Sequence, residues 1–346
     1  MRWQRVCLEA IGYDLPEERV PSEALESQLA PLYERFHLGM GQVETLTGVK
    51  ERRFWPESTR LSDAAARAGR RALEMAGVAP QDVGVVIYGG VCRENLEPAT
   101  ACAVAQHLGL GGETLVLDHA NACLGVLNGI VTVANMIELG QVKAGLVVSA
   151  ESAREIGETT IRRMLAEDSL ETWSKCFASL TGGSGAVGVV LCDAEFSYTQ
   201  RRLRGGVALS APEHHEIARW GPATGLLGET SWVMETDGSA VLTHGVDLGR
   251  RTWLRFLEEL EWRASDVEKV ICHQVGAAHQ RTILESLEIP LEREFHSFEY
   301  LGNMGTASLP VTAALAAEEG FLAAGDRVGF LGIGTGLNCL MLGLEW

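Results

Sequence analysis

Short runs of apolar and β-branched residues recur along the chain, and they alternate with segments in which apolar residues follow a helical period. Seven runs have the composition of buried strands, at residues 83–88, 114–118, 144–149, 186–191, 268–272, 327–331 and 338–344. Seven segments predict helices, at residues 22–36, 62–76, 98–108, 123–139, 247–261, 275–286 and 306–319. Strands that alternate with helices over the whole length predict an α/β protein.

The second half of the chain repeats the pattern of the first half in the same order. The matching pairs are Asp82–Ile87 with Asp266–Ile271, Gly140–Val148 with Gly320–Phe330, and the glycine-rich turns 182–185 and 332–336. Self-similarity at half-length indicates two copies of one α/β unit packed face to face, and we expect them at residues 1–195 and 196–346. Residues 151–183 have no counterpart of equal length. We interpret them as an insertion that could cap a pocket or contact another subunit.

The two glycine-rich turns do not fit a dinucleotide-binding motif. That motif needs a strand, a glycine turn and then a helix whose N-terminus holds the pyrophosphate. A strand pattern follows Gly185, and only ten residues, again with a strand pattern, follow Gly336. The sequence therefore predicts no bound dinucleotide.

Composition narrows the classes of partner. Among 346 residues there are 29 Lys and Arg against 46 Asp and Glu, a formal net charge of −17, which argues against nucleic acid or an anionic membrane. The eight cysteines form no C-x-x-C motif, and no secretory leader is recognisable. The longest uncharged helical stretch, residues 123–137, is too short to span a bilayer. We expect a cytoplasmic protein with reduced thiols, no membrane span and no metal site.

Cys123 lies where a predicted strand meets a predicted helix, in the segment Asp118–Gly125. A thiol at the first turn of a helix is close to unpaired N–H groups and to the positive end of the helix dipole, and both favour the nucleophilic thiolate. The alternative is an inert core cysteine, which is the commoner fate of a free thiol. The position at the turn favours a nucleophile, provided that the chain supplies partners.

Two further segments can supply those partners. His273 lies just past the predicted strand 268–272, and Asn303 precedes the predicted helix that corresponds to the one after Cys123. Each by itself is more often structural, as a packed histidine or a turn asparagine. Together with Cys123 they can form an acyl-transfer site, in which the Cys carries the acyl group and the His and Asn donate hydrogen bonds to an oxyanion. The loop with Gly334, Thr335 and Gly336 could supply a second oxyanion site.

The order Cys123, His273, Asn303 resembles the β-ketoacyl synthase III branch of the thiolase superfamily, and the resemblance covers the whole chain. It includes the segment Thr47–Arg53, the run Gly302–Pro310 and the glycine loop near the C-terminus. Within the branch, the chain is most similar to the acyl-CoA condensing enzymes of bacterial long-chain olefin synthesis. That similarity rests on residues 120–124, 302–305 and 332–339 and on the terminal Trp346. The resemblance implies a thiolase-like fold with two duplicated α/β halves in a five-layered αβαβα arrangement.

The resemblance also implies roles for individual residues. In the olefin-pathway enzymes a glutamate of the partner subunit, in a Leu-Glu-Pro stretch, is thought to remove the α-proton, and Glu97 falls on that position. The residues alone favour a solvent-exposed Glu at a helix start, and Glu94 is a rival for the base. Arg52 and Arg53 are candidates to bind the coenzyme A phosphates, although a solvated basic pair is equally compatible with their position. His119 stands where relatives have an apolar residue, and we interpret it as a packing residue.

We expect a homodimeric acyltransferase whose substrates are fatty acyl-CoAs, with Glu97 crossing the subunit interface and no cofactor beyond the coenzyme A thioesters. Downstream pathway enzymes or acyl carrier protein are further candidate partners. The expected reaction is a Claisen condensation without decarboxylation, which yields a 2-alkyl-3-oxoacyl-CoA. Three alternatives remain open: a malonyl-dependent 3-oxoacyl-ACP synthase III, an acyltransferase that uses the same Cys on an alcohol or amine, and a non-catalytic partner subunit.

Overall fold

The computed structural model describes residues 1–222 and 232–346. The strands of the described residues are β1 (Val6–Asp14), β2 (Glu18–Pro21), β3 (Glu51–Phe54), β4 (Val85–Gly89), β5 (Leu115–His119), β6 (Ala144–Glu151), β7 (Gly185–Asp193), β8 (Arg202–Ser210), β9 (Ala218–Pro222), β10 (Trp232–Thr236), β11 (Lys269–Cys272), β12 (Arg327–Gly334) and β13 (Asn338–Glu345). The α-helices are α1 (Ser22–Glu26), α2 (Ala30–Arg35), α3 (Gln42–Thr47), α4 (Leu61–Ala76), α5 (Thr100–Leu108), α6 (Gly125–Glu138), α7 (Arg154–Glu167), α8 (Leu170–Cys176), α9 (Gly238–Leu260), α10 (Ala277–Ser286), α11 (Phe298–Leu301) and α12 (Ser308–Glu318). None of these helices is both long and apolar enough to cross a bilayer.

Both halves of the chain pair their strands in the same pattern. In the first half β1 is antiparallel to β7, β7 is antiparallel to β6, and β6 is parallel to β4. In the second half β8 is antiparallel to β13, β13 is antiparallel to β12, and β12 is parallel to β11. Beyond β4 lies the parallel strand β5, and beyond β11 a single parallel bridge joins Val270 to Glu294. The seven predicted strands all belong to the sheet that these pairings form. The predicted boundary after residue 195 falls between β7 and β8.

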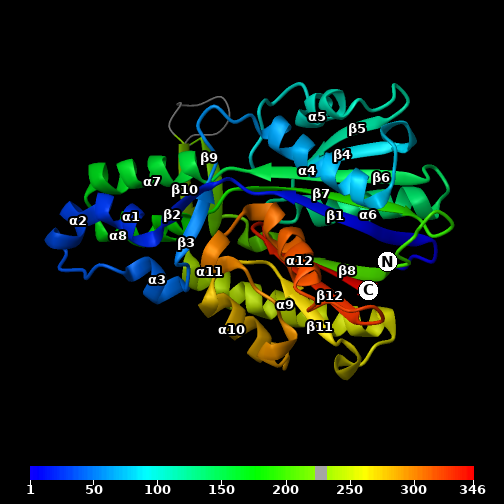
Figure 1. Cartoon of the computed structure of the whole chain (residues 1–346). Coiled ribbons are helices and arrows are strands. Elements are labelled where there is room, and N and C mark those ends of the chain that lie inside the picture. Colours follow the sequence, from blue (N-terminus) through cyan, green and yellow to red (C-terminus); the bar gives the residue numbers. More distant parts are fainter. Residues whose placement is uncertain (223–231) are drawn as a thin grey trace.

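The helices and strands form five layers. One apolar cluster joins α4 and α5 to β1, β4, β6 and β7, and a second joins α9 and α10 to β11, β12 and β13. The largest cluster surrounds α6 and α12, which pack between the two groups of strands. Since β1 and β8 also pair at Cys7 and Arg202, the nine strands form one sheet that bends around the central helices (Figure 1). The predicted thiolase-like α/β fold is confirmed.

Several elements differ from the sequence prediction. Strands β1 and β8 were not predicted, because Glu9 and Gly12 interrupt the apolar run of β1, and Gly205 and Gly206 interrupt that of β8. Pairing with neighbouring strands overrides these weak local preferences. The helix predicted at residues 22–36 is broken into α1, a short 3-10 turn and α2, and α9 begins nine residues earlier than predicted. The Asp237 carboxylate stabilises that early start, because it accepts a hydrogen bond from the Ala240 N–H at 2.9 Å.

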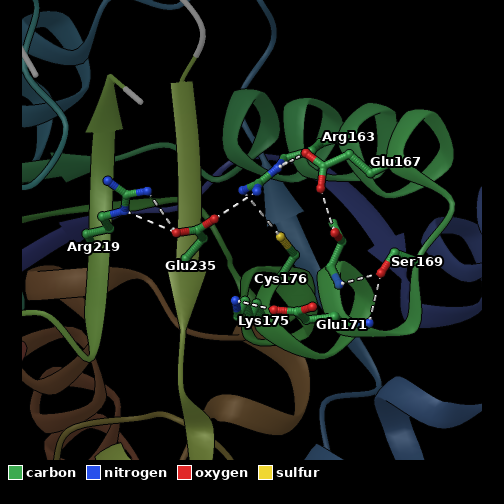
Figure 2. A network of polar contacts seen from close by, with 9 residues as sticks. Arg163, Glu167, Ser169, Glu171, Lys175, Cys176, Arg219 and Glu235 are labelled. Carbon is green, nitrogen blue, oxygen red and sulfur yellow. Dashed lines mark hydrogen bonds and ion pairs between the residues drawn. The ribbon is translucent and has the colours of Figure 1, made fainter. Parts of the chain in front are cut away.

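The segment predicted as an insertion forms a helical lobe, residues 154–181, which lies with α1 and α2 at one end of the molecule (Figure 1). Helices α7 and α8 pack there on apolar side chains that include Tyr33 and Met164. Arg163 on α7 pairs with Glu167 at 2.7 Å and with Glu235 on β10 at 2.8 Å, and Figure 2 shows this network. The helical lobe is thereby joined to the β9–β10 hairpin.

Candidate active site

Cys123 lies in the tight turn between β5 and α6, two residues before the helix begins. The turn is closed by a hydrogen bond of 2.8 Å from the Leu124 N–H to the Asn121 carbonyl. The residue before the cysteine, Ala122, has a φ of 44°, in the left-handed region that a residue with a Cβ rarely adopts. Such strain persists only where the surrounding structure enforces it, and it is common at functional sites.

The start of α6 packs directly against the end of β4. A Cβ placed on Gly89 would lie 2.4 Å from the carbonyl carbon of Gly125, so only glycine allows this approach. The close contact brings the Cys123 turn beside the segment that follows β4, and this segment, residues 90–99, carries both Glu94 and Glu97.

Asn303 lies in the turn before α12, and this turn is bound to the start of α6. The Asn303 N–H donates to the Thr181 carbonyl at 2.8 Å, and the Asn303 carbonyl accepts from the Gly183 N–H at 2.9 Å. The side-chain Oδ1 accepts a hydrogen bond from the Gly305 N–H at 3.0 Å, which leaves the Nδ2 group as the donor. Three residues on, the Thr306 hydroxyl accepts the Val126 N–H of α6 at 2.7 Å.

The glycine loop after β12 lies on another side of the Cys123 turn. A Cβ placed on Gly334 would be 3.4 Å from the backbone nitrogen of Cys123. The loop continues through Thr335 and Gly336, and the Asn338 side chain then donates to the Asn121 Oδ1 at 3.1 Å. The backbone of this loop is thus held beside the Cys123 turn.

His273 follows β11, and its N–H donates to the Leu331 carbonyl of β12 at 3.0 Å. The turn is supported by the buried Gln274 amide, which donates to the Cys272 carbonyl and accepts the Ser297 N–H, each at 2.8 Å. Among the residues that the structure describes, the buried Nδ1 of His273 has no hydrogen-bond partner. The imidazole therefore keeps the capacity for a further hydrogen bond at Nδ1.

Burial affects the protonation of both Cys123 and His273. At Cys123 its effect is opposite to the expectation that the helix would favour a thiolate. Burial, and to a lesser degree the charge of Glu151, raises the pKa of the Cys123 thiol to about 12. Burial, with a smaller contribution from His279, lowers the pKa of His273 to about 4. The helix start was expected to favour the thiolate, but the loss of hydration on burial acts in the opposite direction and raises the pKa of the thiol. Near neutral pH the free enzyme holds a thiol and a neutral imidazole.

These charge states predict slow alkylation of Cys123 by iodoacetamide, because only the thiolate reacts. With a pKa of about 12, the thiolate fraction at pH 7 is on the order of 10⁻⁵. We expect the rate to rise about tenfold per pH unit up to pH 10 without reaching a plateau. Peptide mass spectrometry measures it, with the exposed Cys102 as an internal reference for the reagent. A plateau below pH 9 would show that the free thiol is activated.

The two candidates for the base, Glu94 and Glu97, have different surroundings in the structure. The Glu94 carboxylate accepts hydrogen bonds from the N–H and the hydroxyl of Ser62, at 2.8 and 2.7 Å, and so caps the start of α4. Glu97 is exposed, and the neighbouring Leu96 side chain is 78 % exposed. The same segment ends at α5, where the Thr100 N–H donates to the Asp118 carboxylate of β5 at 2.8 Å. Glu97 thus lies on a projecting segment beside the edge strand of the sheet.

The expected role of Arg52 in binding coenzyme A phosphates is wrong. Its side chain is fully buried, and its guanidinium donates to the Leu180 carbonyl at 2.7 Å and to the Ser22 hydroxyl at 3.0 Å. Burial lowers the pKa of Arg52 to about 10. Arg53 is half-buried and donates to the Pro16 carbonyl at 2.9 Å, and its expected role stays a prediction. His119 is half-buried at the end of β5, where burial lowers its pKa.

One carboxylate near the cysteine was missed by the sequence analysis. Glu151 ends β6, is 4 % exposed, and raises the pKa of Cys123 through its charge. The only signal in the sequence is an acidic residue that ends the apolar strand Ala144–Glu151, and the same pattern is common at exposed strand ends.

Two family models match the chain: "Thiolase, N-terminal domain" over residues 46–175 and "3-Oxoacyl-[acyl-carrier-protein (ACP)] synthase III C terminal" over residues 257–346. An acyl-CoA:acyl-CoA alkyltransferase of Shewanella oneidensis is 49 % identical over 351 residues, covering 100 % of both chains. A β-ketoacyl-[acyl-carrier-protein] synthase III of Clostridioides difficile is 27 % identical, covering 88 % of this chain and 89 % of the relative. A crystal structure of a substituted Xanthomonas campestris OleA superposes with a TM-score of 0.93 at 32 % identity, covering 100 % of both chains.

Proposed function

The chain belongs to the thiolase superfamily, among the acyl-CoA:acyl-CoA alkyltransferases of its 3-oxoacyl-ACP synthase III branch, and we propose that it condenses two fatty acyl-CoAs without decarboxylation. The products are a 2-alkyl-3-oxoacyl-CoA and free coenzyme A. The observation that carries the proposal is the Cys123 turn, which is held between the Gly334 loop and the Asn303 turn. A thiol flanked by hydrogen-bond donors is suited to acyl transfer.

In the first half-reaction Cys123 attacks the thioester carbon of one acyl-CoA. A bond forms between the cysteine sulfur and the acyl carbon, the bond to the coenzyme A sulfur breaks, and the thiol proton passes to the departing thiolate. Since Cys123 is protonated in the free enzyme, His273 accepts this proton only while the attack proceeds. The Asn303 Nδ2 and the Gly334 loop stabilise the oxyanion.

In the second half-reaction Glu97 of the partner subunit removes the α-proton of a second acyl-CoA. The enolate attacks the Cys123 thioester, a carbon–carbon bond forms, and the bond to the cysteine sulfur breaks. The proton held by Glu97 returns to the sulfur, so the site regains its starting state. No further cofactor is required, because both substrates are already activated as thioesters.

A homodimer is part of the proposal, because Glu97 must reach the Cys123 of another subunit. Two features support it. Strand β5 is at the edge of the sheet, where its outer hydrogen-bonding groups can pair with the same strand of a second copy. The exposed Leu96 and Glu97 lie on the segment that ends at α5 beside this edge strand, so both are accessible to a second copy.

The second candidate is malonyl-dependent condensation, which the similarity to β-ketoacyl-ACP synthase III favours. That reaction obtains its carbanion by losing CO2, and so it needs no base for an α-proton. The alkyltransferase relative has the higher identity and covers the full length, which favours the reaction without decarboxylation.

The test is product analysis by mass spectrometry with one long-chain acyl-CoA as the only substrate. We expect a product that contains all the acyl carbons of two substrates, with one coenzyme A released per product. Malonyl-CoA should add nothing to the rate. A product that requires malonyl-CoA and lacks one carbon as CO2 would support the second candidate, and acyl transfer to an added alcohol or amine would support a different acyltransferase.

A further inference from the structure

Glu151 is a buried carboxylate that binds the start of the segment carrying Glu97. Its Oε1 accepts the Val91 N–H at 2.9 Å and its Oε2 accepts the Cys92 N–H at 3.0 Å. The residue is 4 % exposed, and a buried carboxylate is costly unless its hydrogen bonds are satisfied. The chain leaves β4 through these two residues, so Glu151 sets the direction in which the segment departs.

The same carboxylate packs against the turn that orients Asn303. A Cβ placed on Gly305 would lie 3.1 Å from the carboxyl carbon of Glu151 and 3.2 Å from its Oε1. Gly305 has a φ of 54°, and its N–H binds the Asn303 side chain at 3.0 Å. The left-handed backbone favours glycine here, and a Cβ would press against the carboxylate.

In the duplicated fold, Glu151 of the first half occupies the position that corresponds to the glycine loop of the second half. Strand β6 in the first half corresponds to β12 in the second, and the Cys123 turn corresponds to the Asn303 turn. At the end of β12, Gly334 contacts the Cys123 backbone, and at the end of β6, Glu151 contacts the Asn303 turn. The second half therefore places the backbone of the glycine loop, and the first half a carboxylate, at equivalent positions around the site.

We propose that Glu151 is a positioning residue of the condensation: its carboxylate holds the Glu97 segment and the Asn303 turn in fixed relation to each other and to Cys123. The inference rests on the proposed function. In the dimer, each Glu151 would serve the Asn303 of its own subunit and, through Glu97, the second half-reaction in the neighbouring site.

The charge of Glu151 gives the inference a measurable consequence. Burial raises the pKa of Glu151 to about 7, and the hydrogen bonds from Val91 and Cys92 oppose that rise. The titratable groups that face it are Tyr88 on β4, Cys92 in the next segment and Cys123, and its charge raises the pKa of all three. The Asn303–Thr306 turn contributes no titratable group. Removing the charge should therefore make Cys123 easier to ionise.

The chain contains a matched control in Glu9. This glutamate is 3 % exposed on β1, and its Oε1 accepts the N–H groups of Tyr198 and Thr199 at 3.0 and 3.2 Å. Its Oε2 lies 3.6 Å from the sulfur of Cys192. Cys192 pairs with the first residue of β6, whereas Glu151 is the last residue of that strand. Ala144 and Glu151 are seven residues apart along β6, roughly 23 Å, so the two carboxylates lie near opposite ends of that strand. Glu9 resembles Glu151 in its burial and in its hydrogen bonds to loop N–H groups, but it does not lie beside the Cys123 turn.

The experiment compares Glu151→Gln with Glu9→Gln in the full-length protein. For Glu151→Gln we expect iodoacetamide to alkylate Cys123 roughly three- to tenfold faster at pH 9, and condensation to fall roughly 10- to 100-fold while transfer of the first acyl group to Cys123 persists. Glu9→Gln should leave both readouts at the wild-type level. A Cys123 alkylation rate in Glu151→Gln that equals wild type, or equal effects of the two substitutions, would overturn the inference.

A third variant keeps the inference testable if Glu151→Gln does not fold. The alkylation rate distinguishes failure of the Glu151 inference from failure of the proposed function. If Glu151→Gln does not fold, Glu151→Asp retains the charge but retracts it from the two segments. We then expect near-wild-type alkylation of Cys123 with slowed condensation, and unchanged condensation would overturn the inference. Because alkylation requires no acyl-CoA, its result stands even if wild type makes no condensed product, an outcome that would refute the proposed function alone.

Discussion

Replacing Cys123 with alanine should abolish condensation, with a loss of at least roughly 10³-fold, because the proposed mechanism passes through an acyl group held on this sulfur. The fold should persist, since the side chain is small and only partly buried. Incubation with radiolabelled acyl-CoA followed by denaturation should leave label on the wild-type protein and none on the variant. Product formation is measured on the same samples.

Cys102→Ala is the control for this experiment, because Cys102 is an exposed thiol on α5. It should keep both the label and the activity. Acyl label that remains on Cys123→Ala would identify a different acceptor. A variant that still condenses two acyl-CoAs would refute the covalent mechanism altogether.

Replacing Glu97 with alanine should separate the two half-reactions. Cys123 should still become acylated, because that step needs no α-proton removed, whereas condensation should fall by roughly 10²- to 10⁴-fold for loss of a general base. The measurement is a burst of coenzyme A release, at most one per Cys123, without steady turnover. Glu94→Ala is the matched control: it removes the cap of α4 and should lower the free energy of unfolding by about 1 kcal/mol, with condensation retained.

Mixing the two inactive variants tests whether Glu97 acts across the interface. In a dimer of Cys123→Ala with Glu97→Ala, one site combines an intact Cys123 with the intact partner Glu97, and the other site has neither. Random co-assembly should therefore restore about a quarter of the wild-type activity per subunit. Activity that stays at the level of the separate variants would indicate that Glu97 serves its own subunit or no site.

The sequence predicted the strands of the sheet best where local pattern and tertiary environment agree. Strands β4, β6 and β7 are mainly apolar runs that are buried along their whole length, and each begins and ends within two residues of its prediction. Strand β1 was missed because Glu9 lies in its middle. A carboxylate there is acceptable only because the Tyr198 and Thr199 N–H groups, almost 190 residues away, satisfy it.

The roles of charged side chains were predicted least well. Arg52 was expected to bind phosphate, but it lies on strand β3 with its side chain buried between Ser22 and the helical lobe, and the Leu180 carbonyl becomes its partner. Glu94 and Glu97 could not be ranked by spacing. The Ser62 contacts of Glu94 distinguish them, and Ser62 lies 32 residues before Glu94 in the chain.

The sequence by itself determined the α/β alternation and the duplication and supplied the three residues of the proposed acyl-transfer site, because periodicity, repeats and motif order are written along the chain. Only the tertiary structure decided that Cys123 rests as a thiol, that Arg52 is inaccessible and that Glu151 lies beside the cysteine turn. Burial and electrostatic interaction depend on distances in space, and those distances exist only after the two halves have packed around α6 and α12.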